Sequence, residues 1–598
     1  MSRGWRSARR GPVERRGGGG GRFICGGPLH SVRRIWVFGP TFALLVAAAF
    51  LAIGSGGARD AADWAFRGGT ILTLEGDAGG PAQAMAVRGE RIVFVGDSAG
   101  LGDWIGPETR VVDLRGGTLT PGLVDSHFHL INFGKILRDV NLIGTKSWDE
   151  ALARVAERAR AASDGEWILG RGWDQNDWAV KEYPTRAEID SLIPGRLVFL
   201  KRIDGHAALV SGALLERAGI GDETPDPPGG RILRDAGGRA TGVLIDNAVD
   251  AAAKLIPEPS IVERESLLVR VARECVAVGL TDVHDMSTSE ATIRALEDLD
   301  RKNLLPLRVH SYIDGADSAL LRLLEAGPKL PAPGGRLTVR GVKIELDGAL
   351  GSRGAALLAP YSDDPERSGY LRMDVEAYCN LMRLAWERGF QVATHSIGDR
   401  ANRIVLDCYE SLITRDGPGA DRRPRIEHAQ HVAPEEIPRF GALGVIASMQ
   451  PTHATSDMYW AETRVGADRI AGAYAWRSLA SAGARLAFGS DCPVESHDPR
   501  LGLYAAVTRQ DAAGWPEGGW RPAERLTALE ALEAFTSGAA YAAFEEGRLG
   551  TLRLGKEADF VFLSANPLAV EAAELPKLRV VGTWVGGELV YGAPGSEL

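Results

Sequence analysis

The sequence predicts an α/β protein built on a TIM-type (β/α)8 barrel, with a small β-sandwich domain formed from both ends of the mature chain and an insertion after barrel strand 1. Three observations lead to this prediction. Both ends of the chain contain short alternating strands, and between them short apolar strands alternate with helical segments. One unusually long segment separates the first two of these apolar strands.

The two ends of the chain have the pattern of sandwich strands. Residues 61–120 contain alternating segments with tight turns, such as AMAVRGERIVFVGD, and residues 545–598 repeat the pattern in GRLGTLRLGKEADFVFL. Neither end is long enough to close a sheet core by itself, whereas together they make a small sandwich. We therefore expect one β-sandwich assembled from both ends around a barrel at residues 121–544.

Within the central part, strands and helical segments alternate eight times, which is the pattern of a parallel barrel. In such barrels the catalytic groups lie at the carboxyl ends of the strands. The expected strands cover residues 123–125, 281–285, 305–312, 337–348, 390–396, 424–430, 444–451 and 484–491.

The segment between the first two expected strands, about residues 130–278, is far longer than an ordinary barrel connection. It contains helical and strand patterns of its own, including RLVFLKRIDGHAAL. We expect this insertion to form a cap over the barrel mouth and to shape the substrate pocket.

Residues 1–57 have the composition of a leader. Residues 1–34 are rich in Arg and Gly, and residues 35–53 are apolar and uncharged. A basic flank before an apolar run and small residues is typical of an export signal or an uncleaved membrane anchor. We expect an exported protein, periplasmic or extracellular, or one anchored through residues 35–53 with its catalytic domain outside the cytoplasm.

Composition excludes several classes of protein. Hydrophobic residues at 45% and charged residues at 25% are ordinary for a globular chain and argue against wholesale disorder. A net charge of −9, without a basic domain beyond the extreme amino terminus, excludes nucleic acid as a main partner. The five cysteines are scattered and show no Cys-x-x-Cys spacing, which excludes a disulfide framework and a thiolate zinc site.

Candidate metal ligands stand at the carboxyl ends of the expected strands. Side chains alternate along TPGLVDSHFHL, residues 120–130, so His127 and His129 point to the same side of the strand. The other strand ends add Lys343, His395, His428 and Asp491. Nitrogen and carboxylate ligands suit zinc, the favoured ion, or another first-row divalent metal.

Lys343 needs a chemical explanation, because a metal repels an ammonium group. Addition of carbon dioxide would convert this lysine into an anionic carbamate that can bridge two metals. The alternative is an interior lysine paired with Glu345 or Asp347. The number of metal ions, one or two, stays open, and we hypothesise two, bridged by carboxylated Lys343.

Five segments appear in order along the chain: TPGLVDSHFHL, KIELDGALGSRGAAL, ATHSIGDRAN, RIEHAQHV and FGSDCPVESHDP. Together they resemble the amidohydrolase superfamily, in particular amidohydrolase family 3 and its N-substituted formamide deformylase branch. The resemblance covers residues 61–592 and implies a barrel, a sandwich and hydrolysis at a metal centre. His127, His129, His395, His428 and Asp491 fall on the matching motif positions, and Lys343 stands where some relatives carry a carboxylated lysine.

The residues predict a metal-dependent hydrolase that cleaves a carbon–nitrogen bond other than a peptide bond. Its expected partner is a small-molecule amide, with N-substituted formamides among the candidates. A metal lowers the pKa of bound water from about 15.7 to about 7, which makes hydroxide available at neutral pH. Asp491 would be the catalytic residue that takes the proton and returns it to the leaving nitrogen.

Several alternatives remain open at this point. The same centre would serve a cyclic amidohydrolase, a deaminase or an N-acyl amino-acid deacylase, because substrate choice depends on loops and the cap. A non-catalytic exported binding protein is a further alternative, which the intact ligand set disfavours. Whether the chain forms an oligomer is also open.

Three more residues are candidates for substrate binding. His206 and His453 resemble family positions near the substrate, and Trp173 lies in the aromatic GRGWDQNDW segment of the insertion. Each has a structural alternative: the two histidines could be loop residues, and Trp173 could pack in the core of the cap.

Overall fold

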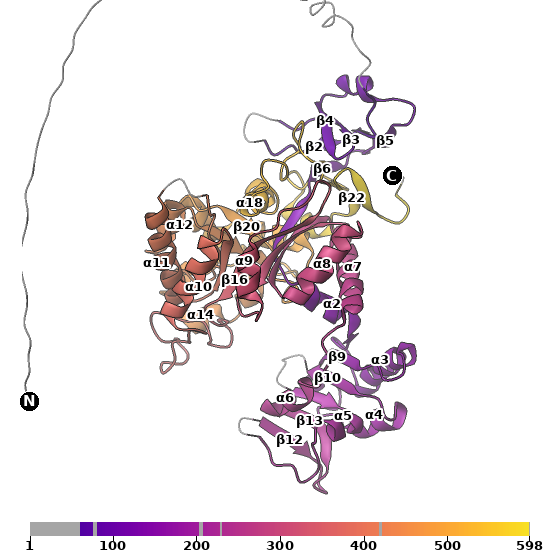
Figure 1. Ribbon diagram of the computed structural model, residues 1–598, viewed down its shortest axis with the longest axis vertical. Coiled ribbons are helices and arrows are strands. Elements are labelled where there is room, and N and C mark those ends of the chain that lie inside the picture. Colours follow the sequence, from indigo (N-terminus) through magenta and orange to yellow (C-terminus); the bar gives the residue numbers. More distant parts are fainter. Residues whose placement is uncertain (1–59, 76–79, 203–206, 228–229, 418–420, 597) are drawn as a thin grey trace, which may run out of the picture. The chain divides into compact units, whose positions relative to one another are not determined.

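The computed structural model describes residues 60–75, 80–202, 207–227, 230–417, 421–596 and 598. Its central feature is an eight-stranded parallel sheet that forms a nearly closed barrel, with strand order β20-β19-β18-β17-β16-β15-β14-β7 (Figure 1). The strands are β7 (Leu123–Phe128), β14 (Leu280–Thr288), β15 (Arg308–Asp314), β16 (Leu337–Glu345), β17 (Gln391–Ser396), β18 (Arg425–His428), β19 (Ile446–Met449) and β20 (Leu486–Phe488). The predicted barrel, with a strand in each of the eight expected segments, is confirmed.

The two ends of the barrel sheet meet beside the candidate metal ligands. Phe128, the last residue of β7, forms a parallel bridge with Cys492, which follows β20. The N–H of Asp491 donates to the carbonyl of His127 at 2.7 Å, and the N–H of His129 donates to the carbonyl of Cys492 at 3.0 Å. Closure of the barrel therefore brings TPGLVDSHFHL and FGSDCPVESHDP into direct contact.

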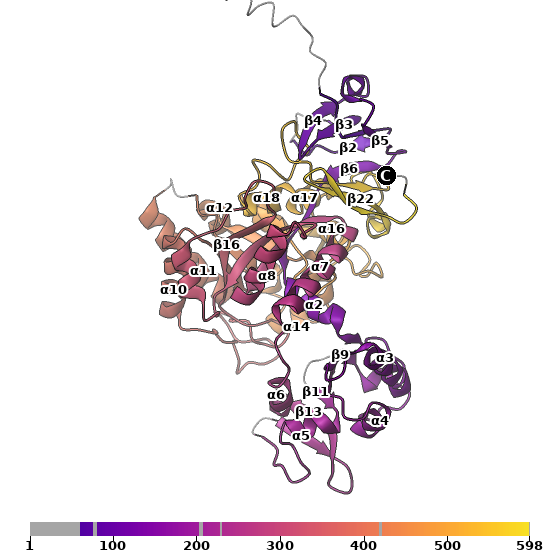
Figure 2. The ribbon, with the colours of Figure 1, turned by 45° about the vertical axis from the view of Figure 1, so that its right-hand side comes forward.

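Helices cover the outside of the barrel because each has an apolar face (Figure 2). In α8 (Glu290–Arg301), Ser289 caps the first turn, and Ile293, Leu296 and Leu299 recur on one face and are buried. The remaining helices of the barrel and its loops are α2 (Leu130–Arg138), α7 (Ile261–Ala277), α9 (Leu320–Ala326), α10 (Val375–Glu387), α11 (Asp399–Asp416), α12 (Ile437–Leu443), α13 (Pro451–Asp457), α14 (Ala461–Val465), α15 (Trp476–Ser481), α16 (Pro499–Thr508), α17 (Ala528–Ala534) and α18 (Ser537–Ala542).

The two ends of the described chain form two sheets with a shared core, the sandwich that the sequence predicts. The strands are β1 (Trp64–Arg67), β2 (Thr70–Ile71), β3 (Ala84–Arg88), β4 (Arg91–Gly96), β5 (Arg110–Asp113), β6 (Thr118–Pro121), β21 (Phe560–Leu563), β22 (Val580–Val585) and β23 (Glu588–Gly592). Their orders are β4-β3-β1-β5 and β2-β6-β21-β22-β23, and β6 pairs antiparallel with β21. Phe66 meets Phe560 and Trp584 in the core, with ring centroids 5.1 and 5.3 Å away.

The insertion between α2 and α7 has a sheet and apolar cores of its own. Its six-stranded sheet has the order β12-β13-β11-β10-β9-β8, and β8 and β9 contact α2. Its elements are β8 (Val140–Asn141), α3 (Trp148–Ala161), β9 (Ile168–Trp173), α4 (Arg186–Leu192), β10 (Val198–Arg202), β11 (Ala207–Val210), α5 (Gly212–Arg217), β12 (Gly230–Arg234), β13 (Ala240–Asp246) and α6 (Asn247–Ala253). Its role as a cap over the barrel mouth stays a prediction.

The structure corrects one inference from the cysteines. Cys379 of α10 and Cys408 of α11 form a disulfide, with their Cα atoms 5.9 Å apart. The scattered spacing excludes a framework of several disulfides, but it conceals this single pair, because two adjacent helices bring residues 29 positions apart into contact. Cys275 and Cys492 are free and buried.

The predicted leader, residues 1–57, and its apolar segment at 35–53 lie outside the described residues. Across the part of the chain that is described, no helix combines the length and apolar character needed to cross a membrane.

Candidate metal centre

The predicted ligands lie together at the carboxyl ends of the barrel strands. They are His127 on β7, His129 directly after it, Lys343 on β16, His395 on β17, His428 on β18 and Asp491 after β20. Parallel register aligns the neighbouring strands: Glu345 pairs with His395, and Ser396 pairs with His428. The strand ends therefore place these side chains on one rim, as parallel pairing requires.

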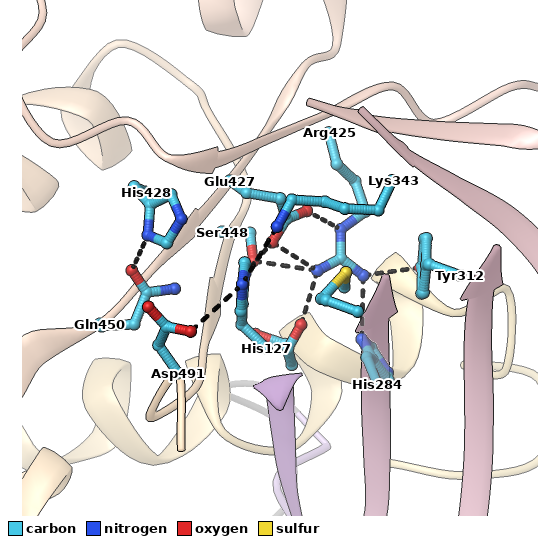
Figure 3. Close-up of polar contacts among 12 residues, drawn as sticks. His127, His284, Tyr312, Lys343, Arg425, Glu427, His428, Ser448, Gln450 and Asp491 are labelled. Carbon is cyan, nitrogen blue, oxygen red and sulfur yellow. Dashed lines mark hydrogen bonds and ion pairs between the residues drawn. The ribbon is translucent and has the colours of Figure 1, made fainter. Parts of the chain in front are cut away.

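His127, His428 and Asp491 form the centre of this group (Figure 3). Each offers one ligand atom, and the three atoms lie within 4.8 Å of one another. Nε2 of His129 lies 3.0 Å from Oδ1 of Asp491, and the ring of His395 lies 4.5 Å from the ring of His428. Four imidazoles and one carboxylate thus converge on a single volume.

Burial keeps most of these imidazoles neutral. It lowers the pKa of His127 and His395 well below the usual value and lowers the pKa of His428 to about 3. Burial alone would raise the pKa of Asp491, but the hydrogen bond from His129 and the nearby histidines hold that pKa below its usual range. Neutral imidazoles present lone pairs and the carboxylate adds negative charge, which is the donor set for a divalent cation.

Two histidine nitrogens test whether these residues fit a metal. Nε2 of His395 is buried and has no hydrogen-bond partner, and Oδ1 of Asp347 stands 3.6 Å from it. Nδ1 of His428 lies 2.8 Å from Oε1 of Gln450, which leaves Nε2 of His428 for another partner. An unpaired buried polar atom costs about 1–3 kcal/mol. A divalent metal would satisfy these nitrogens, so the residues fit one.

The backbone at the centre is strained. His428 and Asp491 adopt left-handed φ angles of 74° and 57°, a region that residues other than glycine rarely visit. Such conformations cost about 1–3 kcal/mol each and accumulate at functional sites. These φ angles direct both side chains toward the centre from the ends of their strands.

Lys343 lies beside the imidazoles inside the barrel. Its side chain is 2% exposed, and its Nζ is 3.4 Å from Nε2 of His127. Burial lowers the pKa of this amine below its usual value. Ion pairs described for the chain link Glu345 to Arg372 and Asp347 to His395, and none links either carboxylate to Lys343.

A carboxylate behind His127 was not identified from the sequence. Oε2 of Glu427 lies 2.7 Å from Nδ1 of His127, and both side chains are fully buried. This contact makes Nδ1 the protonated nitrogen and leaves the lone pair on Nε2. The available signal is the RIEH stretch of β18, where alternation places two charged residues, Arg425 and Glu427, on the inner side of a buried strand.

Arg425 supports Glu427 from the barrel interior. Its Nε donates to Oε1 of Glu427 at 2.8 Å, and its Nη1 donates to the hydroxyl of Tyr312 at 2.7 Å. Further contacts reach Nδ1 of His284 at 2.9 Å and Oγ of Ser448 at 2.9 Å (Figure 3). The layer below the centre is therefore a polar network that fixes Glu427 and, through it, His127.

The three candidate substrate-binding residues have different positions. Nε2 of His453, on α13, lies 3.8 Å from Oδ2 of Asp491, so this residue faces the centre. Trp173 is fully buried in the core of the insertion, and its indole N–H donates to the carbonyl of Leu200 at 2.8 Å. Trp173 therefore packs in the core of the insertion, which is the structural alternative given for this residue above. His206 lies outside the described residues.

Cavity size does not locate the centre. A cavity of about 1070 Å³ lies where Glu90 and Arg110 of the sandwich face Asp300 and Arg336 of the barrel, and no candidate ligand lines it. His129 instead lines a cavity of about 490 Å³.

Comparison with known proteins agrees with the geometry. The model of the amidohydrolase family matches residues 110–591. The putative amidohydrolase YtcJ of Bacillus subtilis is 35% identical over 88% of this chain and 99% of its own, and the N-substituted formamide deformylase of Arthrobacter pascens is 30% identical over 86% of this chain and 96% of its own. A crystal structure of an uncharacterized metal-dependent hydrolase from Pyrococcus horikoshii OT3 covers 85% of this chain and 99% of its own, with 30% identity and a TM-score of 0.72.

These matches span the barrel together with most of the sandwich, and the centre carries the donor set that a divalent metal needs. The expectation of a metal-dependent hydrolase is confirmed at this level. The chain therefore belongs to amidohydrolase family 3, the family that its motifs predict.

Proposed function

We propose that this enzyme hydrolyses the carbon–nitrogen bond of a small amide and that Asp491 transfers the proton. The observation that carries the proposal is the place of Asp491: its carboxylate is 3.0 Å from Nε2 of His129 and 3.6 Å from Nε2 of His127. A low pKa keeps this carboxylate ionised at neutral pH, so it is ready to accept a proton.

His127, His129, His395, His428, Asp491 and a carboxylated Lys343 would hold the metal. When bound, a divalent metal supplies Lewis-acid activation of water and of the substrate carbonyl. Zinc is the ion we favour, because imidazole and carboxylate ligands suit it.

The protein groups carry the proton transfers. Asp491 accepts the proton of the attacking water and returns it to the nitrogen that leaves, so one carboxylate serves both halves of the reaction. His453 approaches Asp491 from α13, and its buried Nε2 has no hydrogen-bond partner. We assign it to the substrate carbonyl oxygen, which a ring N–H can bind.

Lys343 is proposed to be carboxylated and to bridge two metals. The lowered pKa favours the neutral amine, which attacks the carbon of carbon dioxide, loses a proton and becomes a carbamate anion. The distance of 3.4 Å between Nζ of Lys343 and Nε2 of His127 supports a carbamate that would act as one of the ligands.

The name of the Arthrobacter relative supports an amide, and a formamide in particular, as the bond that is cleaved. An N-acyl amino-acid deacylase is the second candidate, which the name of another relative, the N-acyl-D-aspartate deacylase of Alcaligenes xylosoxydans xylosoxydans, supports. Both candidates share the same bond chemistry and differ in the acyl group and in the substituent on nitrogen.

We propose further that the enzyme acts outside the cytoplasm, exported or anchored through residues 35–53. The disulfide between Cys379 and Cys408 supports this location, because structural disulfides persist in oxidising compartments.

The proposal is tested by metal content, intact mass and hydrolysis of an amide panel on one purified sample. About two metals per chain, a mass gain of one carbon dioxide and turnover of formamides are the expected results. One metal per chain and an unmodified lysine would refute the carbamate bridge and leave the proposed hydrolase activity in place. Protein without metal, which gains no activity when zinc is added, would refute the proposal.

A further inference from the structure

The turn that follows β19 carries two buried nitrogens without hydrogen-bond partners. Gln450 directly follows β19 and is the N-cap of α13, and His453 lies in the first turn of that helix. Nε2 of Gln450 and Nε2 of His453 are both buried, and neither has a partner among the described residues. Leaving such a group unpaired costs about 1–3 kcal/mol. Two unpaired nitrogens on one turn, at the carboxyl end of a barrel strand, indicate that a ligand supplies the missing partners.

The amide of Gln450 is oriented by His428. Its Oε1 lies 2.8 Å from Nδ1 of His428 (Figure 3), and its side chain makes no cap hydrogen bond to α13. If Nε2 of His428 is to offer its lone pair to a metal, Nδ1 must carry the proton and donate to Oε1. The tautomer that makes His428 a ligand therefore leaves the NH2 group of Gln450 for another partner. Gln450 is 3% exposed, so solvent does not provide that partner.

A carboxylate has the same role at another histidine of the centre. Nδ1 of His127 meets Oε2 of Glu427 at 2.7 Å, whereas Nδ1 of His428 meets the amide of Gln450. A glutamate at position 450 would accept the same hydrogen bond and would leave no donor unpaired. The amide differs by its NH2 group, which donates two hydrogen bonds and carries no charge. A glutamine at this position is explained if its NH2 group binds an acceptor on the substrate.

Both nitrogens stand next to predicted ligands of the centre. Gln450 contacts His428, whose ligand atom lies within 4.8 Å of that of Asp491. Nε2 of His453 lies 3.8 Å from Oδ2 of Asp491, and its ring is parallel to that of His428, with the centroids 6.0 Å apart. A substrate carbonyl held at the centre would therefore meet two donors from the same turn.

We propose that Gln450 is a catalytic residue whose NH2 group, together with the ring N–H of His453, donates hydrogen bonds to the carbonyl oxygen of the substrate. This inference rests on the proposed function. When water adds to the carbonyl carbon, the π electrons of the C=O bond move onto that oxygen, and Asp491 takes a proton from the water. The two donors stabilise this negative charge until the C=O bond re-forms, the C–N bond breaks and Asp491 returns the proton to the leaving nitrogen.

Two substitutions separate the two halves of the amide. Gln450→Glu keeps an acceptor for Nδ1 of His428 and removes the NH2 group, whereas Gln450→Met removes both. In Gln450→Glu, metal affinity measured with a competing chelator should not fall. The kcat of this variant for N-methylformamide, or for the amide of the panel above that turns over fastest, should fall about a hundredfold, the usual effect of losing one donor to a developing oxyanion. In Gln450→Met, metal affinity should also fall, by about 10–100-fold.

A sulfur analogue identifies the substrate atom that Gln450 contacts. In the matching thioamide, N-methylthioformamide for the first probe, sulfur replaces the carbonyl oxygen and accepts hydrogen bonds poorly. The unmodified enzyme should prefer the amide in kcat/KM, and both variants should reduce this preference about tenfold, the effect of one hydrogen bond to the reacting atom. A structural role, or the charge of the new carboxylate, would lower kcat/KM for both compounds by the same factor.

Gln510→Glu is the matched control, since Gln510 lies after α16 and its NH2 group donates to the carbonyls of Gly514 and Pro516. It should change neither the metal affinity nor the preference for the amide. Full activity in Gln450→Glu, equal losses for amide and thioamide, or a fall in its metal affinity would overturn the inference and leave the hydrolytic function standing. No turnover of any amide in the panel by the metal-loaded unmodified enzyme would refute the proposed function and the inference with it.

Discussion

Nδ1 of His127 lies 2.7 Å from Oε2 of Glu427 in the closed interior of the barrel. Nδ1–H of His127 donates a hydrogen bond to this carboxylate, so the lone pair of His127 is on Nε2, which lies 3.6 Å from Asp491 and 3.4 Å from Lys343. Arg425 contacts Glu427 from the barrel interior and compensates its charge. The orientation of His127 therefore depends on Glu427 and, behind it, on Arg425.

Replacing Glu427 by Gln should weaken metal affinity by about 10–100-fold, the usual effect of losing the group that orients a metal-binding histidine. An amide cannot hold the Nδ1 proton as a carboxylate does, and it leaves Arg425 without its counter-ion. Titration with a competing chelator measures the change. Glu524→Gln, on a buried glutamate that binds Ser478 away from the centre, is the control. Unchanged affinity in Glu427→Gln would show that the contact does not orient His127.

Asp491→Asn should keep most of the bound metal, because the imidazoles remain, and should lower kcat roughly a hundredfold or more, the scale of general acid–base catalysis. Metal analysis and steady-state kinetics on the same sample separate the two effects. A variant with full activity would exclude Asp491 from proton transfer, and a variant without metal would make it chiefly a ligand.

Lys343→Ala should abolish turnover, and a short carboxylate such as propionate should restore part of it by taking the place of the carbamate. Lys343 is 2% exposed, so its truncation leaves a buried space for the added carboxylate. Activity measured against propionate concentration tests this, with Lys302→Ala as the control that needs no rescue. Full activity without propionate would place Lys343 outside the mechanism.

The barrel and its rim could be predicted because each needs only local patterns. Eight short apolar strands separated by helices define the sheet, and the last residues of those strands define the rim. His127, His395 and His428 were therefore identified by their position alone.

The residues that support the ligands from the barrel interior could not be predicted in the same way. Glu427 is next to His428 in sequence, but no local pattern indicates that its side chain contacts His127, which lies 300 residues earlier on another strand. Cys379 and Cys408 present the same difficulty, since their pairing depends on how two helices pack.

His431 gives the protein a predictable pH dependence of stability. It is 1% exposed, and burial lowers its pKa to about 4, against the opposing effect of Asp399 at 3.6 Å. Between pH 6.5 and 4 the unfolded chain binds a proton that the folded protein excludes, so the free energy of unfolding falls as pH falls through this window. At about 1.4 kcal/mol per pKa unit, the loss from this residue is roughly 3–4 kcal/mol.

His431→Gln should flatten this slope while leaving the rest of the pH profile in place. Denaturant unfolding at several pH values, with both proteins at the same metal loading, measures the difference. Parallel profiles for the two proteins would show that His431 does not titrate in this window.

The disulfide between Cys379 and Cys408 should stabilise the α10–α11 pair by restricting the unfolded chain. For a separation of 29 residues, the chain-entropy relation gives about 3–4 kcal/mol. The double variant Cys379→Ser and Cys408→Ser should therefore unfold at lower denaturant, and a reducing agent should destabilise the unmodified enzyme but not the variant. Thiol titration of the unfolded, exported protein should find Cys275 and Cys492 free and the other two oxidised. If Cys275, Cys379, Cys408 and Cys492 all react without a reducing agent, the disulfide is absent and the argument for an oxidising compartment loses its structural support.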